Sequence, residues 1–285
     1  ASTIKWSEWI SREKDCKLII HVADHNKFFF EEKSLKILKK AHSVFVISEK
    51  MKKLYEKYTD RNDIKVFHNF PDNRCYPKDN AHYSTNRVFS SESPLMITFI
   101  GGLYSCLHKD SIEDFIKSIS TLHSSGKKIE LRFYGARHPS TFLEKELSME
   151  GITHHGLVKP LEKKYQIMHD SDAFVLPSSF DPKINEEYKY SFPSKLTELV
   201  ATGKPIIYYG PSNTAASEFL SEINGTIIIN EKSSVRISDL LCQLLIDYSD
   251  IIRTSKESRS RFKKEFSKNR ILSEFIMQLE QTVLK

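Results

Sequence analysis

The sequence has few of the patterns that mark membrane, disulfide-rich or repeat proteins. Its longest apolar runs, such as Leu95–Ile100, are far shorter than the ~20 residues needed to span a bilayer. Only 4 cysteines occur in 285 residues, and no two of them form a Cys-x-x-Cys pair. This scarcity argues against a zinc ribbon or a disulfide framework, and it favours a reducing compartment. No repeat of solenoid period is visible.

The charge balance is also moderate. Lys plus Arg is 43 and Asp plus Glu is 37, which gives a net charge of +6 at pH 7. With 28% charged and 39% hydrophobic residues, the composition is that of a globular domain with a substantial core. The small positive excess suits an anionic small molecule, a phosphorylated substrate or an acidic membrane surface, and it is too small to require nucleic acid.

What the sequence does contain is an alternation of short apolar segments with helical patterns. In the first part, residues 16–22, 43–47 and 64–67 have the continuous apolar, β-branched composition of buried strands. Residues 31–41 and a segment from the N-cap Ser48 to about residue 58 have helical patterns. The order strand, helix, strand, helix, strand predicts an α/β unit with a parallel sheet.

After a polar, Pro-containing linker at residues 74–94, a second and longer α/β series begins. We expect its strands at 95–100, 129–134, 153–155, 173–176, 205–209 and 225–229, and its helices at 111–122, 140–149, 162–169, 193–202, 213–220 and 238–248. This pattern predicts a doubly wound parallel sheet. We therefore divide the chain into residues 1–73, the linker 74–94, a nucleotide-binding unit at 95–249 and basic C-terminal helices at 250–285, which we expect to return to the first unit. A cleft between the two units is the expected ligand site.

The first candidate motif for that ligand follows the strand at 95–100. Gly101 and Gly102 would let backbone N–H groups approach a phosphate, and Lys109 before the next helix would add a positive charge. Paired glycines after a strand more often mark a simple turn.

The second and more specific motif is residues 190–207 (YSFPSKLTELVATGKPII). A proline suits the first turn of a helix, so the amides of Ser194, Lys195 and Leu196 would be free to bind a diphosphate. Glu198, one turn later, could accept two hydrogen bonds from a ribose diol. The alternative is a helix capped by Pro and Gly with a solvated Glu.

These segments, taken in order, resemble the retaining GT-B glycosyltransferases, the group 1 family. Residues 68–72 (HNFPD) are similar to the turn before the family's domain linker, and 99–109 to its Gly-Arg-Leu loop. Residues 131–135 resemble the strand that ends in glycine, and 155–158 (HGLV) the turn that frames the nucleotide base. Residues 171–178 (SDAFVLPS) and 190–205 match the last two family segments. The resemblance implies a GT-B-like α/β fold with two Rossmann-like domains.

The resemblance also implies roles for individual residues. His21 matches the histidine that contacts the donor sugar near the reacting centre, and Asp24 and His25 are close enough in sequence to substitute for it. The other implied roles concern four parts of the donor. Residues that would bind the diphosphate are Gly101, Gly102, Lys109, Ser194, Lys195 and Leu196, and Glu198 would bind the ribose. The base would be framed by Gly135, Gly156, Leu157 and Val158, and the donor sugar would contact Tyr190, Phe192 and Glu187.

The sequence departs from the family pattern at three places. Gly102 stands where the family has Arg, and Tyr190 stands where it has the first Glu of a paired-Glu motif, so Glu186 or Glu187 would have to replace that carboxylate. If His21 is aligned correctly, about half of an N-terminal domain is missing, and we expect an incomplete acceptor-side domain.

The implied function is transfer of a sugar from a UDP or GDP sugar to an acceptor hydroxyl with retention, a hexosyltransferase-type activity (EC 2.4). The resemblance further implies polysaccharide or glycolipid synthesis, a glycan or lipid-linked acceptor, no metal and no cofactor. We expect a cytoplasmic protein without a nucleic-acid partner. The basic helices near Lys33 and Lys263 are either solvated faces or a peripheral contact with anionic lipid at the inner face of the membrane.

Two alternatives remain open at this stage. One is a GT-B sugar-nucleotide epimerase. The other is a non-catalytic module that binds nucleotide sugars or acts as a scaffold, which the short first domain and Tyr190 favour.

Overall fold

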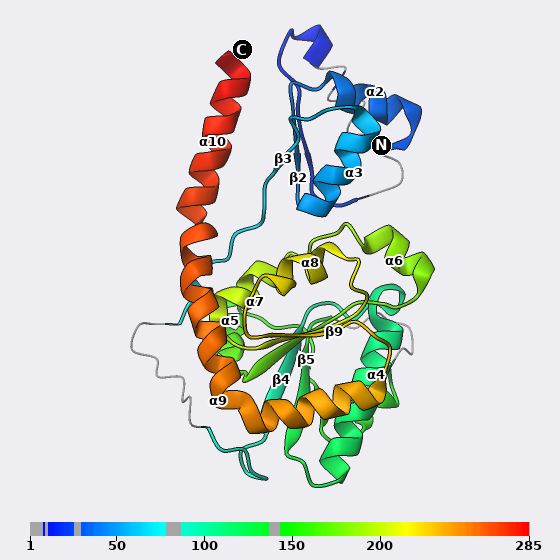
Figure 1. The fold of residues 1–285 in the computed structure, drawn as a ribbon, viewed down its shortest axis with the longest axis vertical. Coiled ribbons are helices and arrows are strands. Elements are labelled where there is room, and N and C mark those ends of the chain that lie inside the picture. The colour runs from blue at the N-terminus through cyan, green and yellow to red at the C-terminus, as the bar shows by residue number, and fades with distance from the viewer. Residues whose placement is uncertain (1–7, 9–10, 26–29, 78–86, 137–142, 285) are drawn as a thin grey trace.

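The computed structural model describes the chain except for residues 1–7, 9–10, 26–29, 78–86, 137–142 and 285 (Figure 1). It contains two parallel β-sheets covered by helices, so the predicted α/β class is confirmed. The smaller sheet has the order β1-β2-β3 and is flanked by two helices. Its elements are β1 (Ile19–Val22), α2 (Glu32–Lys40), β2 (Ser43–Val46), α3 (Glu49–Thr59) and β3 (Lys65–Val66).

The larger sheet has six parallel strands in the order β6-β5-β4-β7-β8-β9. Counted from β4, this is the doubly wound order 3-2-1-4-5-6, in which the winding direction reverses between β4 and β7. Ligands of such sheets bind in the crevice beyond the carboxyl ends of the strands at this reversal. The strands are β4 (Leu95–Ile100), β5 (Ile129–Tyr134), β6 (Ile152–His154), β7 (Ala173–Pro177), β8 (Ile206–Tyr209) and β9 (Thr226–Ile229).

Helices cover both faces of this sheet, and several differ from the prediction. The helix expected at 140–149 is wrong: the described residues there form turns and a short 3-10 helix, with Leu143 at φ 64°. The seven-residue helix α6 was not predicted. The helices of this part are α4 (Ser105–Ser124), α5 (Leu161–Asp170), α6 (Pro182–Tyr188), α7 (Leu196–Thr202), α8 (Ala215–Ser221) and α9 (Ser234–Glu265).

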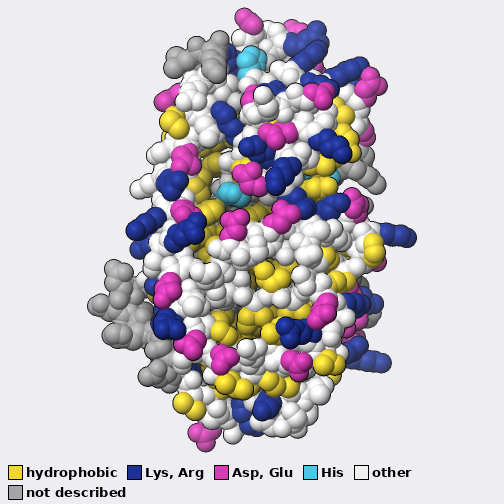
Figure 2. Space-filling view, in the orientation of Figure 1, with side chains coloured by type: hydrophobic (Ala, Val, Ile, Leu, Met, Phe, Trp, Pro, Cys, Tyr) yellow, Lys and Arg dark blue, Asp and Glu magenta, His cyan; other side chains and the backbone are white. Residues whose placement is uncertain are grey.

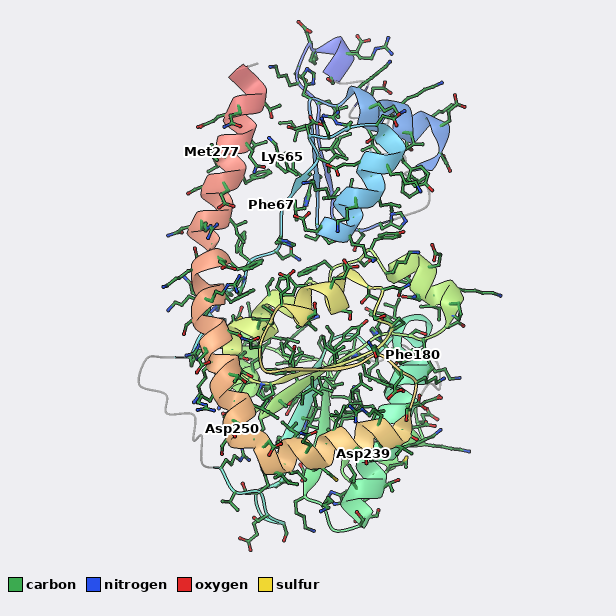
Figure 3. The ribbon with its side chains drawn as sticks, viewed as in Figure 1. Lys65, Phe67, Phe180, Asp239, Asp250 and Met277 are labelled. Carbon is green, nitrogen blue, oxygen red and sulfur yellow. The ribbon has the colours of Figure 1, made fainter. Side chains whose placement is uncertain are left out.

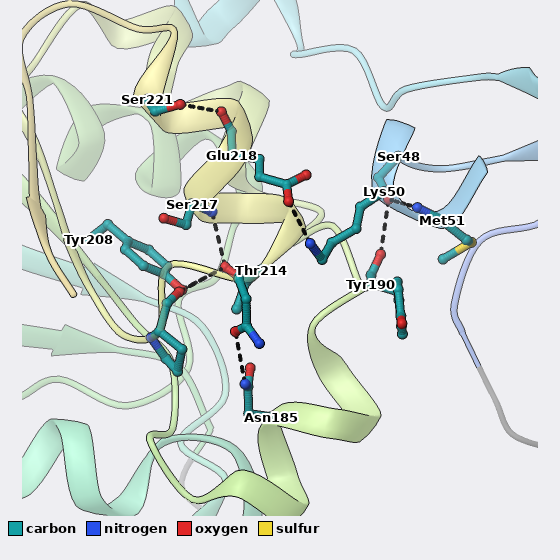
Figure 4. A network of polar contacts seen from close by, with 12 residues as sticks. Ser48, Lys50, Met51, Asn185, Tyr190, Tyr208, Thr214, Ser217, Glu218 and Ser221 are labelled. Atoms are coloured by element: carbon teal, nitrogen blue, oxygen red, sulfur yellow. Dashed lines mark hydrogen bonds and ion pairs between the residues drawn. The ribbon is translucent and has the colours of Figure 1, made fainter. Parts of the chain in front are cut away.

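The two sheets are joined through α3, α8 and the segment before α7 (Figure 4). Ser48 caps α3 by accepting a hydrogen bond from the Met51 amide at 3.1 Å, and its hydroxyl donates to the Tyr190 carbonyl, also at 3.1 Å. Lys50 and Glu218 form an ion pair at 2.5 Å between α3 and α8. One apolar cluster runs from Val44 and Tyr55 in the smaller part to Phe174 and Phe262 in the larger part. The two parts therefore share a core.

The C-terminal helix α10 (Lys268–Leu284) continues from α9 and lies beside the smaller sheet (Figure 1). Phe275 packs on Phe45 and Phe67, with ring centroids 4.9 Å and 4.5 Å apart, and Figure 3 shows Phe67 on the side of the sheet that faces α10. The hydroxyls of Ser43 and Thr282 lie 2.7 Å apart in the same contact. Among the described helices, none combines the length and apolar composition that a membrane span requires.

Candidate functional site

A cleft of about 660 Å³ opens at the carboxyl ends of β4 and β7, where the winding of the larger sheet reverses. Its volume lies within the roughly 300–1,000 Å³ typical of small-molecule sites. The lining comes from both parts of the molecule: Asp24 and His25 follow β1, while Gly101, Gly102 and Lys195 belong to the larger part.

The cleft brings the two predicted diphosphate motifs together. A Cβ built on Gly101 would lie 3.9 Å from the Lys195 Nζ, so the ammonium group adjoins the glycine backbone. Burial lowers the pKa of Lys195, the charge of Lys164 lowers it further, and Glu198 opposes both effects. A partly desolvated cation in a cleft favours a phosphate group. The Gly101 amide, however, donates to the Tyr134 carbonyl at 2.9 Å, so its predicted contact with a phosphate is corrected.

The segment before α7 does not form the predicted helix start. α7 begins at Leu196 rather than at Pro193, and the Leu196 amide donates to the Pro193 carbonyl at 2.9 Å. Leu196 is also fully buried, so its predicted contact with a diphosphate is corrected. Ser194 and Lys195 line the cleft, and their contact with a diphosphate stays a prediction.

Gly135 closes the back of the glycine loop. A Cβ on Gly135 would lie 1.8 Å from the Gly101 carbonyl oxygen, a distance that only glycine permits. The Gly135 amide donates to the Gly156 carbonyl at 2.8 Å, which joins two of the residues predicted to frame the base. The other two follow directly: Leu157 is 63% exposed and Val158 is half-buried. None of these four lines the cleft itself.

An aromatic stack lies next to these glycines. The rings of Tyr134 and His155 are parallel within 8°, with centroids 4.5 Å apart, at the ends of β5 and β6. Burial and nearby positive groups lower the pKa of His155, which favours the neutral ring. A flat, uncharged aromatic pair beside the glycines provides a surface on which a base could stack.

The smaller part contributes His25 rather than His21. His21 lies on β1 with its side chain exposed and packed edge-on against Phe67, outside the cleft lining. His25 lines the cleft, 4.9 Å from the Tyr190 ring, and its Nδ1 lies 3.5 Å from the Tyr55 hydroxyl. Burial lowers the pKa of His25, which favours the neutral imidazole. The predicted placement of His21 in the cleft is therefore corrected in favour of the residue considered as its substitute.

A second histidine, His108, lines the cleft where the sequence suggested Lys109. Because α4 begins at Ser105, Lys109 lies in its second turn, exposed and outside the cleft lining. Burial lowers the pKa of His108 to about 4. Its Nδ1 is buried and has no hydrogen-bond partner among the described residues. The prediction that Lys109 meets the diphosphate is corrected.

Glu198 is held away from the cleft lining by a neighbour on α5. Its carboxylate pairs with the Lys164 Nζ at 2.5 Å, and the two side chains are only 17% and 16% exposed. The pair lies close enough to Lys195 to influence its pKa. Glu198 is thus near the cationic end of the cleft, with one carboxylate oxygen already engaged.

The predicted donor-sugar residues are placed differently from one another. Phe192 lines the cleft and is 5% exposed, whereas Tyr190 lies behind His25 and against the Lys189 ammonium at 5.1 Å. The Glu187 side chain lies outside the described residues. Glu186 is exposed and paired with Lys189 at 2.6 Å.

Sequence reasoning missed several polar residues of the cleft. None of them was singled out as a site residue, and the signal that could have found them was proximity to the carboxyl end of a strand. These residues are Ser178 and Ser179 after β7, Asn185 and Tyr188 on α6, and Tyr208 and Thr214 on either side of the β8–α8 turn. Within the described part of the chain, no three His, Cys, Asp or Glu side chains gather as a set of metal ligands.

A family model described as glycosyl transferases group 1 matches residues 94–247. Among solved structures, Anabaena HepE in complex with UDP and glucose is similar, with a TM-score of 0.73 and 12% identity over 98% of this chain and 76% of that one. A glycosyltransferase from Rickettsia africae has a TM-score of 0.68 and 12% identity over 99% and 81% of the two chains. Sucrose-phosphate synthase from Thermosynechococcus elongatus has a TM-score of 0.67 and 14% identity over 98% and 71%. At these identities the likeness shows the fold, and a search of curated proteins finds no match.

Proposed function

The chain belongs to the glycosyl transferases group 1 family, and on that premise we propose that it transfers a hexose from a UDP or GDP sugar to an acceptor hydroxyl. The observation that carries the proposal is the juxtaposition of Lys195 and Gly101 in the cleft at the β4/β7 reversal. The similar structure of HepE was solved with UDP and glucose, which supports a nucleotide sugar as the donor.

In this reaction the leaving nucleoside diphosphate carries the developing negative charge. Lys195 would stabilise that charge, together with the backbone amide of Gly102, without covalent catalysis. No metal or other cofactor is required by this scheme. His25, the histidine of the smaller part that lines the cleft, would contact the donor sugar near the reacting centre.

The finer features of the reaction are also proposals. The family resemblance supports retention of the anomeric configuration, with both oxygens on the same face of the sugar. A structural neighbour, WaaG, is described as involved in lipopolysaccharide biosynthesis, which supports a role in polysaccharide or glycolipid synthesis with a glycan or lipid-linked acceptor. We also propose that the protein is cytoplasmic. Its basic surfaces would make a peripheral contact with anionic lipid of the membrane.

The diphosphate site is tested by two lysine variants whose predicted effects differ. Lys195→Ala removes the cation that adjoins Gly101, so we expect UDP or GDP to bind roughly 10- to 100-fold more weakly, as for loss of a hydrogen bond to a charged group. Lys109→Ala removes an exposed lysine outside the cleft and should leave binding unchanged. Isothermal titration with UDP, GDP and ADP measures both.

Three outcomes separate the candidate functions. Binding of none of the nucleotides, or equal loss in both variants, contradicts the proposed site. Binding together with release of nucleotide from a nucleotide sugar in the presence of acceptor supports a transferase. Binding without any turnover of UDP-sugar or GDP-sugar supports the non-catalytic module instead.

A further inference from the structure

A second cavity of about 670 Å³ lies at the junction of the two parts, between α3, α8 and the middle of α9. We call it the junction groove. Its lining includes the aromatic rings of His68, Phe192, Phe219, Phe262 and Phe266. Figure 2 shows hydrophobic side chains on this face, between the two parts, with acidic and basic side chains around them. None of its residues has been assigned to the donor cleft except Phe192, which lines both cavities.

The aromatic residues form a continuous surface. The His68 ring lies 5.2 Å from Phe192 and 5.5 Å from Phe266, and Phe219 meets Phe266 edge-on at 5.6 Å. Phe219 and Phe266 are only partly buried. Aromatic rings of this kind pack well against the C–H faces of a ligand that is apolar on one side and polar on the other.

His68 supplies a polar atom without a partner inside this surface. Its Nδ1 is buried and has no hydrogen-bond partner among the described residues. Burial lowers the pKa of His68, which favours the neutral ring, and a hydrogen bond with the Ile47 backbone opposes this effect in part. A neutral imidazole nitrogen either donates or accepts, depending on its tautomer, and a hydroxyl group can pair with it in both cases. An ammonium group could only donate to it, and a phosphate could only accept.

The rim of the groove carries charges of both signs. Glu218 pairs with Lys50 at 2.5 Å, and Arg261 pairs with Glu265 at 2.9 Å. Glu222 and Lys53 add further exposed groups of opposite sign. Such pairs keep lone pairs and N–H groups that can still form hydrogen bonds. They suit a neutral ligand with many donors and acceptors better than an ion of either sign, because each ion would meet like charges.

The groove has a neighbouring cavity. This smaller cavity of about 300 Å³, between β3 and α10, shares the lining residues His68, Glu265 and Phe266 with it. Two adjoining cavities whose linings extend from α8 to α10 suit an oligomer better than a single small molecule.

From the aromatic lining, the unpartnered His68 nitrogen and the mixed-charge rim, we propose that the junction groove binds a neutral oligosaccharide outside the donor cleft. The inference rests on the proposed function in one respect, since a sugar transferase that acts on a glycan has such a chain as acceptor or product. Phe192, which precedes the Pro193–Lys195 segment, would connect groove occupancy to the donor cleft.

The test uses two tryptophan variants on one helix. Ser258 lines the groove, so Ser258→Trp fills it, whereas Ser260 lies two residues further along α9, exposed and outside the lining. The probes are maltohexaose, cellohexaose and chitohexaose, followed by saturation-transfer NMR and calorimetry on the full chain. We expect at least one probe to bind the wild type and to shift the His68 imidazole resonances. Ser258→Trp should weaken that binding at least tenfold, and Ser260→Trp should not change it.

A second pair of variants, with smaller changes, keeps the test valid if the tryptophan variant misfolds. Lys53→Ala removes a donor from the rim, and Lys57→Ala removes an exposed lysine of the same helix outside the lining. Only the first should weaken the binding. The proposal is overturned if no probe binds, if the members of each pair behave alike, if Lys195→Ala rather than Ser258→Trp abolishes binding, or if spermidine binds the groove and the sugars do not.

Failure of the proposed function gives a different result. UDP and GDP titrations on the same samples report the donor cleft alone. Oligosaccharide binding that depends on Ser258, in a protein that binds no nucleotide, would contradict the transferase and leave the groove inference standing. Nucleotide binding without oligosaccharide binding would contradict the groove inference and leave the proposed transferase function standing.

Discussion

At the scale of single residues, the direction of a side chain on α4 decides which group meets the donor cleft. Consecutive residues of an α-helix point about 100° apart. With α4 already formed at Ser105, Leu107 and His108 line the cleft and Lys109 points away from it. The motif that the sequence displays, two glycines followed by a lysine, therefore places a histidine rather than a lysine beside the glycines.

His108 also makes stability depend on pH. Its pKa is about 4 in the folded chain and near 6.5 in an unfolded one, so the unfolded chain binds the proton more tightly. The stabilisation is complete above pH 6.5 and is lost as the pH falls from 6.5 towards 4. We expect urea midpoints to decrease between pH 7.5 and 5, and His108→Gln to reduce that decrease by on the order of 1–2 kcal/mol in unfolding free energy.

Four other histidines with lowered pKa values contribute in the same direction and will keep part of the pH dependence in the variant: His21, His25, His68 and His155. The comparison is therefore between slopes, measured by circular dichroism at several pH values. An unchanged slope in His108→Gln would show that this ring is not held neutral by the fold.

Glu198 is the residue whose role depends most on a ligand. The family resemblance assigns it to the ribose hydroxyls, while in the structure one of its oxygens pairs with Lys164 at 2.5 Å. If Glu198 binds the ribose diol, Glu198→Gln should weaken the binding of UDP roughly 10-fold or more. The binding of 2′,3′-dideoxy-UDP should change little, because this nucleotide has no diol for Glu198 to bind. The ratio of the two dissociation constants, measured by calorimetry, checks this. A ratio that stays as in the wild type places the ribose elsewhere.

At the scale of elements, α3 depends on a serine with two tasks. Ser48 caps the helix and also donates to the Tyr190 carbonyl of the larger part. Ser233 caps α9 by accepting a hydrogen bond from the Arg236 amide at 3.1 Å. Within the described residues, its hydroxyl does not also donate to a carbonyl of the other part, as that of Ser48 does. Loss of a cap costs about 1 kcal/mol, and an unpaired, partly buried carbonyl costs up to about 1 kcal/mol more. We therefore expect Ser48→Ala to lose about twice the unfolding free energy lost by Ser233→Ala in urea titrations.

Equal losses in the two alanine variants would mean that the contact with Tyr190 adds nothing to the cap. Near-UV circular dichroism on both variants shows whether the aromatic contacts around Tyr190 remain in place.

The elements themselves were predicted with uneven success, and the reason is local. β4 and β5 have the predicted bounds, because continuous apolar runs mark buried strands. The helix predicted at 140–149 failed because Leu143 adopts a left-handed conformation, which its residue type does not reveal. α7 starts later than predicted because the Pro193 carbonyl is used in a turn by the Leu196 amide. Hydrophobic pattern predicts the presence of an element better than its first residue.

The residues of the candidate site were also predicted with uneven success. Lys195 and Gly101 were predicted and lie together, since both follow strand ends that the parallel topology brings to one edge. His108 carried no signal of its own, because its inward direction depends on where α4 begins. The pairing of Glu198 with Lys164 joins residues 34 positions apart, and no local pattern predicts such a contact.

At the scale of the whole molecule, the chain returns at its end to the sheet where it began. α10 lies along the smaller sheet (Figure 3). Its Phe275 packs on Phe45 of β2 and on Phe67, which follows β3. The smaller sheet has three short strands and two flanking helices, a small amount of structure for independent stability. Its order should therefore depend on a contact made more than 200 residues later in the sequence.

Phe275→Ala tests this dependence. Truncation of a fully buried Phe costs roughly 3–5 kcal/mol, and less is expected for this half-buried ring. The loss should be local: amide hydrogen exchange in β1–β3 should accelerate by at least tenfold, while β4–β9, whose core lies largely under α4 and α9, should exchange as in the wild type. Met277→Ala, two residues further along and 50% exposed, is the matched control and should change neither sheet. Acceleration spread equally over both sheets would instead mean that they unfold as one unit, as the shared apolar cluster around Tyr55 and Phe262 would permit if it were the stronger link.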